Sequence, residues 1–580
     1  MENNKIDQNV LDRAQLWLDG DYDTETKSKI REMIENSPAE LIDAFYKDLE
    51  FGTGGLRGVM GAGTNRMNKY TVGAATQGLA NYMKKMFADR EGLSVAIAFD
   101  SRNNNTFFAG ICADVLSANG IKVFVFDDIR PTPELSFAIR HLKCQAGIVI
   151  TASHNPPEYN GFKAYWEDGG QLIAPHDKNV IGEVNKIKDI DQINFNRESG
   201  LVESIGEEID KAYLENIAAL SLSPEIVKKH KDLKIVYTPI HGTGVKLVPA
   251  GLKAFGFKNI YNVPEQDIAD GNFPTVKSPN PEEPAALNMA INKAKEINAN
   301  IVMATDPDAD RVGIAVRNNK NEFVLLNGNQ TATLLINYLI KKWKENGKLT
   351  GNEYIVKTIV TSEILKDIAL KNGVDYFDTL TGFKFIAEVL RLNEGKKTFI
   401  GGGEESYGYL VGDFVRDKDA VISCCMIAET AAWAAEQGKT LYELLPDIYV
   451  EFGFYKERLQ SIVRKGKTGA EEIAQMMVDY RKNPPAKINN SEVVVIKDYQ
   501  GQIEKNLVDK TKRTINLPKS NVLQFFLADG SKISVRPSGT EPKIKFYFSV
   551  KDELKNKSEY DTLNAKLEKR LDSIISDMGL

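Results

Sequence analysis

Four polar loops in the sequence carry residue types that could do chemistry. The first, residues 151–156, places Ser153 and His154 directly after the apolar run 146–150. A serine hydroxyl becomes a nucleophile only beside a base or an electrophile, and adjacency to His154 does not by itself define a catalytic triad. Taken alone, this loop would more often be a turn capped by a serine.

The second loop, which follows another apolar run, holds three aspartates at alternate positions, Asp306, Asp308 and Asp310. Carboxylates at this spacing can converge on a hard cation. An EF-hand is excluded because its sixth and twelfth positions are Arg311 and Arg317 instead of glycine and glutamate. Unpaired carboxylates so close together repel one another, and a bound divalent ion would relieve that repulsion. The pattern therefore favours a metal site over a solvated turn.

The third loop, Glu404-Glu405-Ser406, follows three consecutive glycines, which permit the backbone to approach a ligand closely. Carboxylate oxygens accept hydrogen bonds from the hydroxyls of a neutral sugar, and this loop could supply two carboxylates.

The fourth loop combines cations, hydroxyls and a glycine turn, which are the ingredients of an anion-binding nest. The alternative is a surface hairpin turn, and the combination favours phosphate. Its polar residues and glycine are Arg536, Ser538, Gly539, Thr540, Lys543 and Lys545.

The elements that must position these loops repeat along the chain. Short β-branched runs alternate with helix-length amphipathic segments, which indicates βαβ units and mixed or parallel sheets. Ligands gather beyond the carboxyl ends of strands in such sheets, so three matching loops predict one composite site. The expected strands are 94–100, 122–126 and 146–150, then 234–238, 259–263 and 300–304, then 353–360, 375–378 and 398–400.

The last part of the chain has a different pattern. Segments 521–527, 532–535 and 543–549 alternate as antiparallel strands do, and an amphipathic helix is expected over 560–578. We therefore predict an α/β protein with three similar mixed-sheet domains and a C-terminal α+β domain around a central cleft. The expected domains are 1–205, with an N-terminal helical extension, then 206–324, 325–450 and 451–580.

Composition excludes several classes of protein. The 580 residues carry 74 Lys and Arg against 80 Asp and Glu, a net charge of −6, which gives no reason to expect a nucleic acid or an acidic membrane as a partner. We expect neither a signal peptide nor a membrane span, and the four cysteines suit neither zinc nor a disulfide framework. Common nucleotide-binding glycine patterns are incomplete. We expect a soluble, cytoplasmic protein.

Together the four loops resemble the α-D-phosphohexomutase superfamily, in the branch of phosphoglucomutases and phosphomannomutases. The resemblance covers about residues 51–547, with the motifs in the family's order. It implies that Ser153 is the phosphoserine that carries the phosphoryl group. It also implies that Asp306, Asp308 and Asp310 bind one Mg²⁺ per chain, with an oxygen of the phosphorylated Ser153 completing the site.

The resemblance assigns the remaining site residues by motif. Arg57 and Lys163 correspond to basic residues near the transferred phosphoryl group, and His154 lies within a matching motif. The sugar-reading loop is matched by Glu404 and Ser406. The loop for the other phosphate is matched by Arg536, Ser538, Gly539 and Thr540.

Two positions depart from the common pattern of the family. Lys545 stands where arginine is usual, which keeps the charge but loses the bidentate fork. After Thr381-Gly382, the chain has Phe383 and Lys384, as the glucose-type branch does, where dual-specificity bacterial enzymes have histidine after the glycine. This makes Lys384 a candidate phosphate or acid–base contact.

The implied activity is interconversion of α-D-glucose 1-phosphate and glucose 6-phosphate through glucose 1,6-bisphosphate, which also acts as activator. The alternatives are a phosphomannomutase, a phosphopentomutase, a glucose 1,6-bisphosphate synthase, or a sugar-phosphate-binding protein without activity. The intact Ser153 and aspartate triplet argue against the last of these. A sugar monophosphate is the expected partner, and the chain is expected to be a monomer or a weak dimer.

Overall fold

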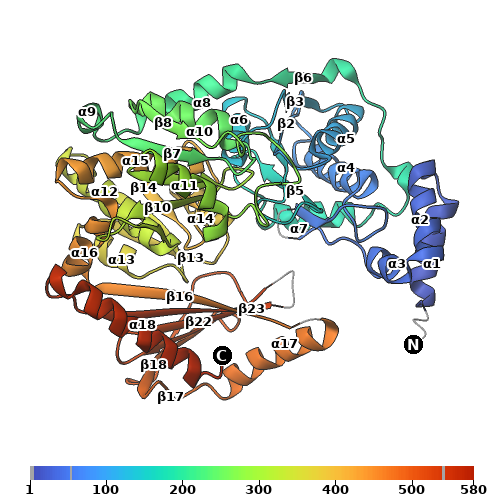
Figure 1. Ribbon diagram of the computed structural model, residues 1–580. Helices are drawn as coiled ribbons and strands as arrows, with labels where there is room; N and C mark the ends of the chain where they lie inside the picture. Colours follow the sequence, from blue (N-terminus) through green and yellow to red (C-terminus); the bar gives the residue numbers. More distant parts are fainter. Residues whose placement is uncertain (1–5, 53–54, 465, 539–542) are drawn as a thin grey trace.

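The computed structural model describes residues 6–52, 55–464, 466–538 and 543–580. The chain forms four β-sheets that follow one another along the sequence, with helices packed around the first three (Figure 1). The predicted succession of three similar α/β units and a distinct C-terminal unit is therefore present.

The first three sheets share one topology. In each, three parallel strands are followed by a polar loop and by an antiparallel strand that returns beside the third parallel strand. The equivalent orders are β5-β4-β2-β3, β10-β9-β7-β8 and β15-β14-β12-β13. The three sequence-predicted loops therefore occupy the same topological position, at the carboxyl end of a central parallel strand.

The first sheet has the order β1-β5-β4-β2-β3-β6. Its central strands β2 and β4 are buried along their whole length, as expected for parallel strands covered by helices on both faces. Its strands are β1 Gly55–Val59, β2 Ser94–Phe99, β3 Lys122–Phe126, β4 Ala146–Ile150, β5 Tyr159–Trp166 and β6 Val202–Ile205. Its helices are α4 Lys69–Met86, α5 Asn105–Ala118, α6 Thr132–His141 and α7 His176–Val184.

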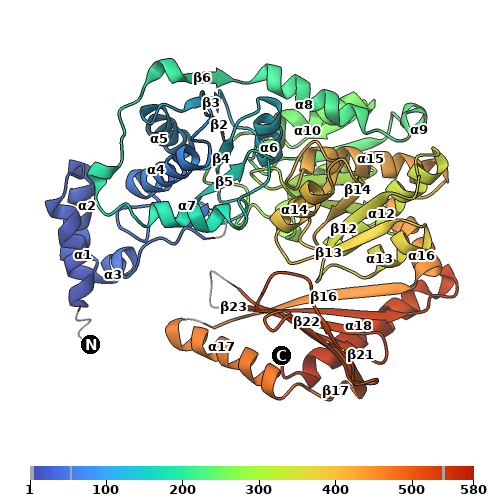
Figure 2. The ribbon, with the colours of Figure 1, turned by 180° about the vertical axis from the view of Figure 1, so that it is seen from behind.

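Three helices precede the first sheet and form the predicted extension at one end of the molecule, α1 Gln8–Asp19, α2 Thr24–Asn36 and α3 Pro38–Phe45 (Figures 1 and 2). They bury a small apolar cluster against the start of α4. The rings of Phe45 and Tyr70 contact the Trp17 ring edge-on, with centroids 5.7 and 5.5 Å away. The extension is thus fixed to the first unit.

The second sheet has the order β11-β10-β9-β7-β8. Its strands are β7 Lys234–Thr238, β8 Asn259–Asn262, β9 Ile301–Thr305, β10 Val312–Arg317 and β11 Phe323–Leu326. Its helices are α8 Glu207–Ala219, α9 Pro224–Lys229, α10 Gly244–Phe255 and α11 Asn288–Glu296.

The third sheet has the order β13-β12-β14-β15, from β12 Glu353–Thr358, β13 Asp375–Thr379, β14 Thr398–Gly403 and β15 Tyr409–Val411. The three glycines expected to open the sugar loop belong instead to β14, where they pair with both β12 and β15. Glycine suits this strand because a Cβ on Gly402 would lie 2.3 Å from the Val356 carbonyl oxygen. The surrounding helices are α12 Gly328–Glu345, α13 Ile364–Lys371, α14 Phe383–Asn393, α15 Ala420–Glu436 and α16 Leu441–Phe452.

The fourth sheet is antiparallel, in the order β16-β23-β22-β21-β18-β19-β20, with β17 paired to β18. Its strands are β16 Phe454–Val463, β17 Lys487–Ile488, β18 Ser491–Asp498, β19 Ile503–Asn506, β20 Lys512–Thr514, β21 Leu523–Leu527, β22 Lys532–Pro537 and β23 Lys543–Asp552. Its helices are α17 Gly466–Lys482 and α18 Tyr560–Asp577. The expected C-terminal helix and all three expected strands are present.

The division into domains at 205, 324 and 450 stays a proposal. The second of these positions falls inside β11 and the third inside α16, so the sheet and helix continue a few residues past each of them. Among the described residues, none of the helices has the length and apolar character that a bilayer span requires.

Candidate functional site

A cleft of about 800 Å³ is lined by residues from all four units. The first unit contributes Arg57 and His154, and the second contributes Arg311. The third contributes Glu404 to Tyr407, and the fourth contributes cationic residues of β22 and β23. The shared strand order explains this, because each of the first three sheets directs one loop to the cleft.

Ser153 lies in the loop between β4 and β5, and only 3% of it is exposed. Its hydroxyl donates a hydrogen bond of 2.6 Å to Asp306 Oδ2 and lies 3.2 Å from His154 Nδ1. Burial, followed by the nearby Arg311 and Arg57, lowers the pKa of His154 well below its ordinary value. A neutral His154 beside the hydroxyl follows from this.

Left-handed backbone at a non-glycine residue recurs in all three loops. Ser153, Ala309 and Tyr407 have φ values of 52°, 49° and 66°. Such conformations cost about 1 kcal/mol or more and persist where the surroundings impose them. The three loops are therefore held in defined shapes by their neighbours.

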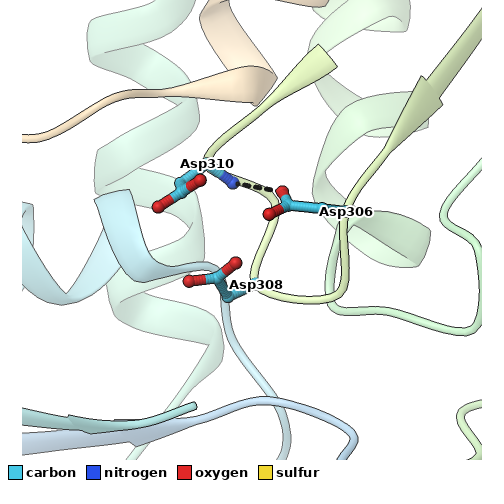
Figure 3. A group of neighbouring side chains, drawn as sticks. All are labelled: Asp306, Asp308 and Asp310. Atoms are coloured by element: carbon cyan, nitrogen blue, oxygen red, sulfur yellow. Dashed lines mark hydrogen bonds between the residues drawn. The ribbon is translucent and has the colours of Figure 1, made fainter. Parts of the chain in front are cut away.

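The side chains of Asp306, Asp308 and Asp310 converge at the start of β10 (Figure 3). Each offers a carboxylate oxygen, and these oxygens lie within 4.8 Å of one another. Asp306 Oδ1 accepts hydrogen bonds from the backbone N–H groups of Asp310 and Arg311, at 3.1 and 3.0 Å. Burial, and then the charges of Asp308 and Asp310, raise the pKa of Asp306 well above its ordinary value.

The three carboxylates fit a divalent cation with oxygen ligands. All three residues are at most 2% exposed. Asp308 Oδ1 and Asp310 Oδ1 are buried and have no hydrogen-bond partner among the described residues. Buried polar atoms normally find partners, and three neighbouring carboxylates without a cation repel one another. A hard ion such as Mg²⁺ would satisfy both requirements.

Two lysines flank the carboxylates. Lys163 Nζ lies 2.8 Å from Asp308 Oδ2 and 3.6 Å from Asp310 Oδ2, and Lys418 Nζ lies 2.9 Å from Asp310 Oδ2. Burial acts to raise the pKa of Asp308, but the charge and hydrogen bond of Lys163, together with Asp306 and Lys418, outweigh it, and the net shift is downward. Lys163 comes from the first unit and Lys418 from the third, so three units meet at the aspartate loop.

The sugar loop is held on both sides. Glu404 Oε1 accepts a hydrogen bond of 2.8 Å from the backbone N–H of Gly382. The loop also lies against the start of α12, where a Cβ on Gly328 would come within 1.9 Å of the Glu405 carbonyl oxygen. Glu404 is 7% exposed and lines the cleft with Ser406, which places its carboxylate at the surface of the cleft.

The fourth unit presents cations to the cleft, with Arg536, Ser538, Lys543 and Lys545 among its lining residues. Burial, followed by the charges of Lys543 and Arg536, lowers the pKa of Lys545. The negative charge of a bound phosphate would offset the repulsion among these three cations and so favour the protonated form of Lys545. The predicted site residues Gly539 and Thr540 lie outside the described part of the chain.

Among the described residues, seven of the sequence-predicted ones line the cleft, namely Arg57, His154, Glu404, Ser406, Arg536, Ser538 and Lys545. Ser153, Lys163 and the three aspartates are not part of this lining, but they contact one another next to the lining residues His154 and Arg311. Arg57 NH1 donates to Asn155 Oδ1 at 3.2 Å, beside the Ser153 loop. Lys384 is different, because it lies in a separate small cavity with Trp166, His176 and Arg391 and does not belong to the described lining of the cleft. Its position in the first turn of α14 directs it away from Gly382, which does line the cleft. Within the described part of the chain, Lys384 therefore lies outside the cleft lining.

Two buried basic residues were missed by the sequence reasoning. Lys418 belongs to the charged run 416–419 directly before the apolar helix α15, and such a run at the start of a buried helix is a signal that could have been used. Arg102 follows β2 and carries no motif of its own. Its guanidinium donates to the carbonyl oxygens of Ser153, Asn155, Pro156 and Tyr159, at 2.6, 2.5, 2.9 and 3.1 Å.

Family models for phosphoglucomutase/phosphomannomutase match the chain in four parts. Alpha/beta/alpha domains I, II and III match residues 48–191, 211–320 and 327–452, and the C-terminal domain matches residues 481–563. A protein named phosphoglucomutase from Staphylococcus haemolyticus is 38% identical over 511 residues, which are 87% of this chain and 91% of that protein. The chain belongs to the phosphoglucomutase/phosphomannomutase family. A protein of the same name from Staphylococcus aureus (strain MSSA476) is 37% identical over 540 residues, 93% of this chain and 95% of that protein.

Solved structures of this family share the fold. The phosphoglucomutase pp63/parafusin from Paramecium, in its open form, matches with a TM-score of 0.67 at 18% identity, covering 92% of this chain and 96% of that one. A family protein from Burkholderia thailandensis matches with a TM-score of 0.64 at 19% identity, over 91% of this chain and 96% of that one. The predicted four-unit architecture of a phosphohexomutase is therefore confirmed.

Proposed function

We propose that the protein is a phosphoglucomutase that interconverts α-D-glucose 1-phosphate and glucose 6-phosphate through a phosphorylated Ser153. The observation that carries the proposal is the contact of the Ser153 hydroxyl with Asp306 at 2.6 Å, at the edge of a cleft whose opposite wall is cationic. Family membership and the name phosphoglucomutase of relatives 37 to 38% identical support glucose as the sugar.

In the proposed reaction, the bond from phosphorus to Ser153 Oγ breaks as a bond forms from phosphorus to a free hydroxyl oxygen of the bound sugar phosphate. The Ser153 oxygen keeps the electron pair of the broken bond, and in the net reaction it takes up the proton lost by the sugar hydroxyl, so that a free serine hydroxyl is formed. The product is a sugar bisphosphate, which must turn over before it returns its other phosphate to Ser153. The sugar monophosphate leaves with the phosphate at the other position.

The residues around Ser153 suit this transfer. Lys163 and Arg57 place positive charge beside the moving phosphoryl group, whose charge spreads over its outer oxygens. Asp306, Asp308 and Asp310 would hold one Mg²⁺, which would supply further positive charge next to the serine oxygen. Closure of the cleft against water protects the phosphoserine from hydrolysis.

The opposite side of the cleft suits the rest of the substrate. Arg536, Ser538 and Lys545 provide donors for the phosphate that does not react. Glu404 offers a carboxylate oxygen to the sugar hydroxyls. Because the intermediate is bound in two orientations, these two loops must serve both.

A coupled assay with the purified protein, Mg²⁺ and glucose 1,6-bisphosphate tests the proposal, with glucose, mannose, glucosamine and ribose 1-phosphates as substrates. Glucose 1-phosphate should give the highest kcat/KM, and Ser153→Ala should abolish turnover. Ser101→Ala is the matched control, since Ser101 Oγ is also buried but has no partner among the described residues. Faster turnover of mannose or ribose 1-phosphate would reassign the substrate, and net bisphosphate formation from a phosphoryl donor would indicate a synthase.

Several expectations stay predictions. These are the single Mg²⁺ per chain, the activating role of glucose 1,6-bisphosphate, the monomeric or weakly dimeric state, the cytoplasmic location and the absence of a nucleic-acid or membrane partner. The role of Lys384 also stays a prediction, and in this structure it would require movement of its side chain into the cleft.

A further inference from the structure

The turn at residues 359–363 follows β12 and contacts the fourth unit, whose sheet lies below the third unit in Figure 1. On its side toward the sugar loop, the hydroxyls of Thr358 and Thr361 donate to Glu405 Oε2, at 3.2 and 3.1 Å. Both threonines are completely buried. The turn and the last residue of β12 therefore hold the second glutamate of the sugar loop through two partly buried hydrogen bonds.

The other side of the same turn is held by the fourth unit. Lys532 Nζ donates to the carbonyl oxygens of Ile359 and Thr361, at 3.1 and 3.3 Å, and forms an ion pair of 2.6 Å with Glu363 Oε1. Gln524 Nε2 donates to the same Ile359 carbonyl at 2.7 Å. Lys532 is 3% exposed, so its side chain contacts the turn and hardly any solvent.

Lys532 is the first residue of β22, and the same strand leads directly to Arg536 and Ser538 of the phosphate loop. β22 is hydrogen-bonded to β21 on one side and to β23 on the other, so the strand transmits the position of its first residue to its last. The sugar loop and the phosphate loop, which must both bind the same substrate, are therefore connected through the five-residue turn 359–363.

An apolar cluster reinforces the connection. Ile359 and Val360 of the turn pack with Val522 and Tyr547 of the fourth unit, and all four are at most 8% exposed. The turn cannot shift against the fourth-unit sheet without opening this cluster.

We propose that Lys532 is a positioning residue, which sets the separation between the sugar loop and the phosphate loop through the 359–363 turn. The proposal rests on the proposed mutase function, because only a substrate held by both loops senses their separation. Lys532 lines the cleft, yet it acts through the turn, since its donors are directed to Ile359, Thr361 and Glu363.

Lys532→Met tests this, since it keeps the unbranched side chain and removes the donors. Loss of positioning weakens the binding of substrate and transition state alike, so KM for glucose 1-phosphate should rise about tenfold with kcat within about threefold of wild type. Lys532→Arg, which retains charge and donors, should restore KM to within about threefold. A kcat loss with unchanged KM would overturn the positioning role.

Lys551→Met is the matched control. Lys551 also links the fourth unit to the third, through Asp367 Oδ2 of α13 at 3.0 Å, and it donates to the Tyr455 hydroxyl of its own unit at 2.7 Å; neither partner belongs to the turn. Its KM should stay within about twofold of wild type. An increase equal to that of Lys532→Met would show that general docking of the fourth unit is responsible, and would contradict a specific role for the turn.

A double-variant cycle tests transmission through the turn. Thr361→Val removes the hydroxyl that holds Glu405, whereas Lys532→Met removes the contact with the fourth unit. Because both act on one connection, the double variant should show a KM within about twofold of the worse single variant. A KM increase equal to the product of the two single effects would show independent action and overturn the proposal.

Equilibrium binding separates this proposal from the proposed function. In a Ser153→Ala background, calorimetry with glucose 1,6-bisphosphate measures binding without turnover. Lys532→Met should raise Kd about tenfold, and an unchanged Kd would refute the positioning role. Absence of mutase activity in the wild-type protein would instead refute the proposed function.

Discussion

Arg102 offers a quantitative test of how the Ser153 loop is held in its reactive shape. Its guanidinium, whose side chain is fully buried, donates to four carbonyl oxygens of the loop and lies 3.6 Å from Asp100. Arg102→Met leaves these carbonyls and a buried carboxylate without their cation. Removing one partner of a buried charged pair costs about 3–5 kcal/mol, so we expect the free energy of unfolding to fall by about that amount.

The same loss should appear in activity among molecules that remain folded. If about 3 kcal/mol of preference for the reactive loop conformation is lost, kcat/KM falls about 100-fold, because each 1.36 kcal/mol corresponds to a factor of about ten. Arg102→Lys keeps the charge but cannot reach four acceptors, and we expect a decrease of about tenfold. Arg197→Met, which removes an exposed ion pair with Asp114, is the control and should leave activity unchanged.

The measurements are the coupled mutase assay, urea unfolding to establish the folded fraction, and hydrogen exchange across residues 153–159. Faster exchange confined to this loop should accompany the loss of activity. If folded Arg102→Met retained kcat/KM within about threefold of wild type, the backbone contacts of Arg102 would not be what orders the Ser153 loop.

Two further predictions concern the aspartate site and the interface between the third and fourth units. Asp308→Asn should lower kcat at least about 100-fold, because a metal ligand is lost. Its free energy of unfolding in EDTA should fall by less than the roughly 3–5 kcal/mol expected for a lone buried pair, because losing the 2.8 Å contact with Lys163 is offset by relief of the repulsion among the three carboxylates. EDTA should likewise inactivate the wild-type protein, and Mg²⁺ should restore it; full activity of either the variant or the chelated enzyme would count against a metal role. Burial raises the pKa of Glu457 to about 7, against hydrogen bonds from Ser362 and Ser549. Between about pH 4.5 and 7, Glu457 is protonated in the folded protein but ionised in the unfolded chain. Its contribution to the free energy of unfolding is therefore full below about pH 4.5 and is lost as pH rises through about 7. The free energy of unfolding of Glu457→Gln minus that of wild type, measured in urea, should therefore increase by about 3 kcal/mol from pH 4.5 to pH 8. A difference that does not depend on pH would refute the pKa shift.

Much of the fold was accessible from the sequence because the strands are short, apolar and bounded by clear breakers. The repeated pattern correctly predicted three equivalent sheets, and β3, β4 and β7 match their expected bounds. The extent of β14 was missed, since the glycine run 401–403 is typical of a loop, and only pairing with β12 and β15 shows that it is a strand. Local pattern cannot report a cross-strand contact of this kind.

The candidate site shows the same limit. Residues within loops could be proposed because their types and spacing suggest chemistry, as for Ser153 and the three aspartates. Arg102, which acts through backbone carbonyls, carries no local pattern, whereas Lys418 stands in a charged run that only the position of the buried helix α15 makes informative. The placement of Lys384 depends on the direction of the first turn of α14, which no spacing rule specifies.

The central claim is that Ser153 carries the phosphoryl group. Its most direct test is intact and peptide mass spectrometry of the protein after incubation with glucose 1,6-bisphosphate and Mg²⁺, followed by addition of glucose 1-phosphate. We expect one phosphoryl group per chain, located on Ser153, which is lost to the sugar as glucose 6-phosphate and bisphosphate form. Phosphate on another residue, or full mutase turnover by Ser153→Ala, would contradict the account.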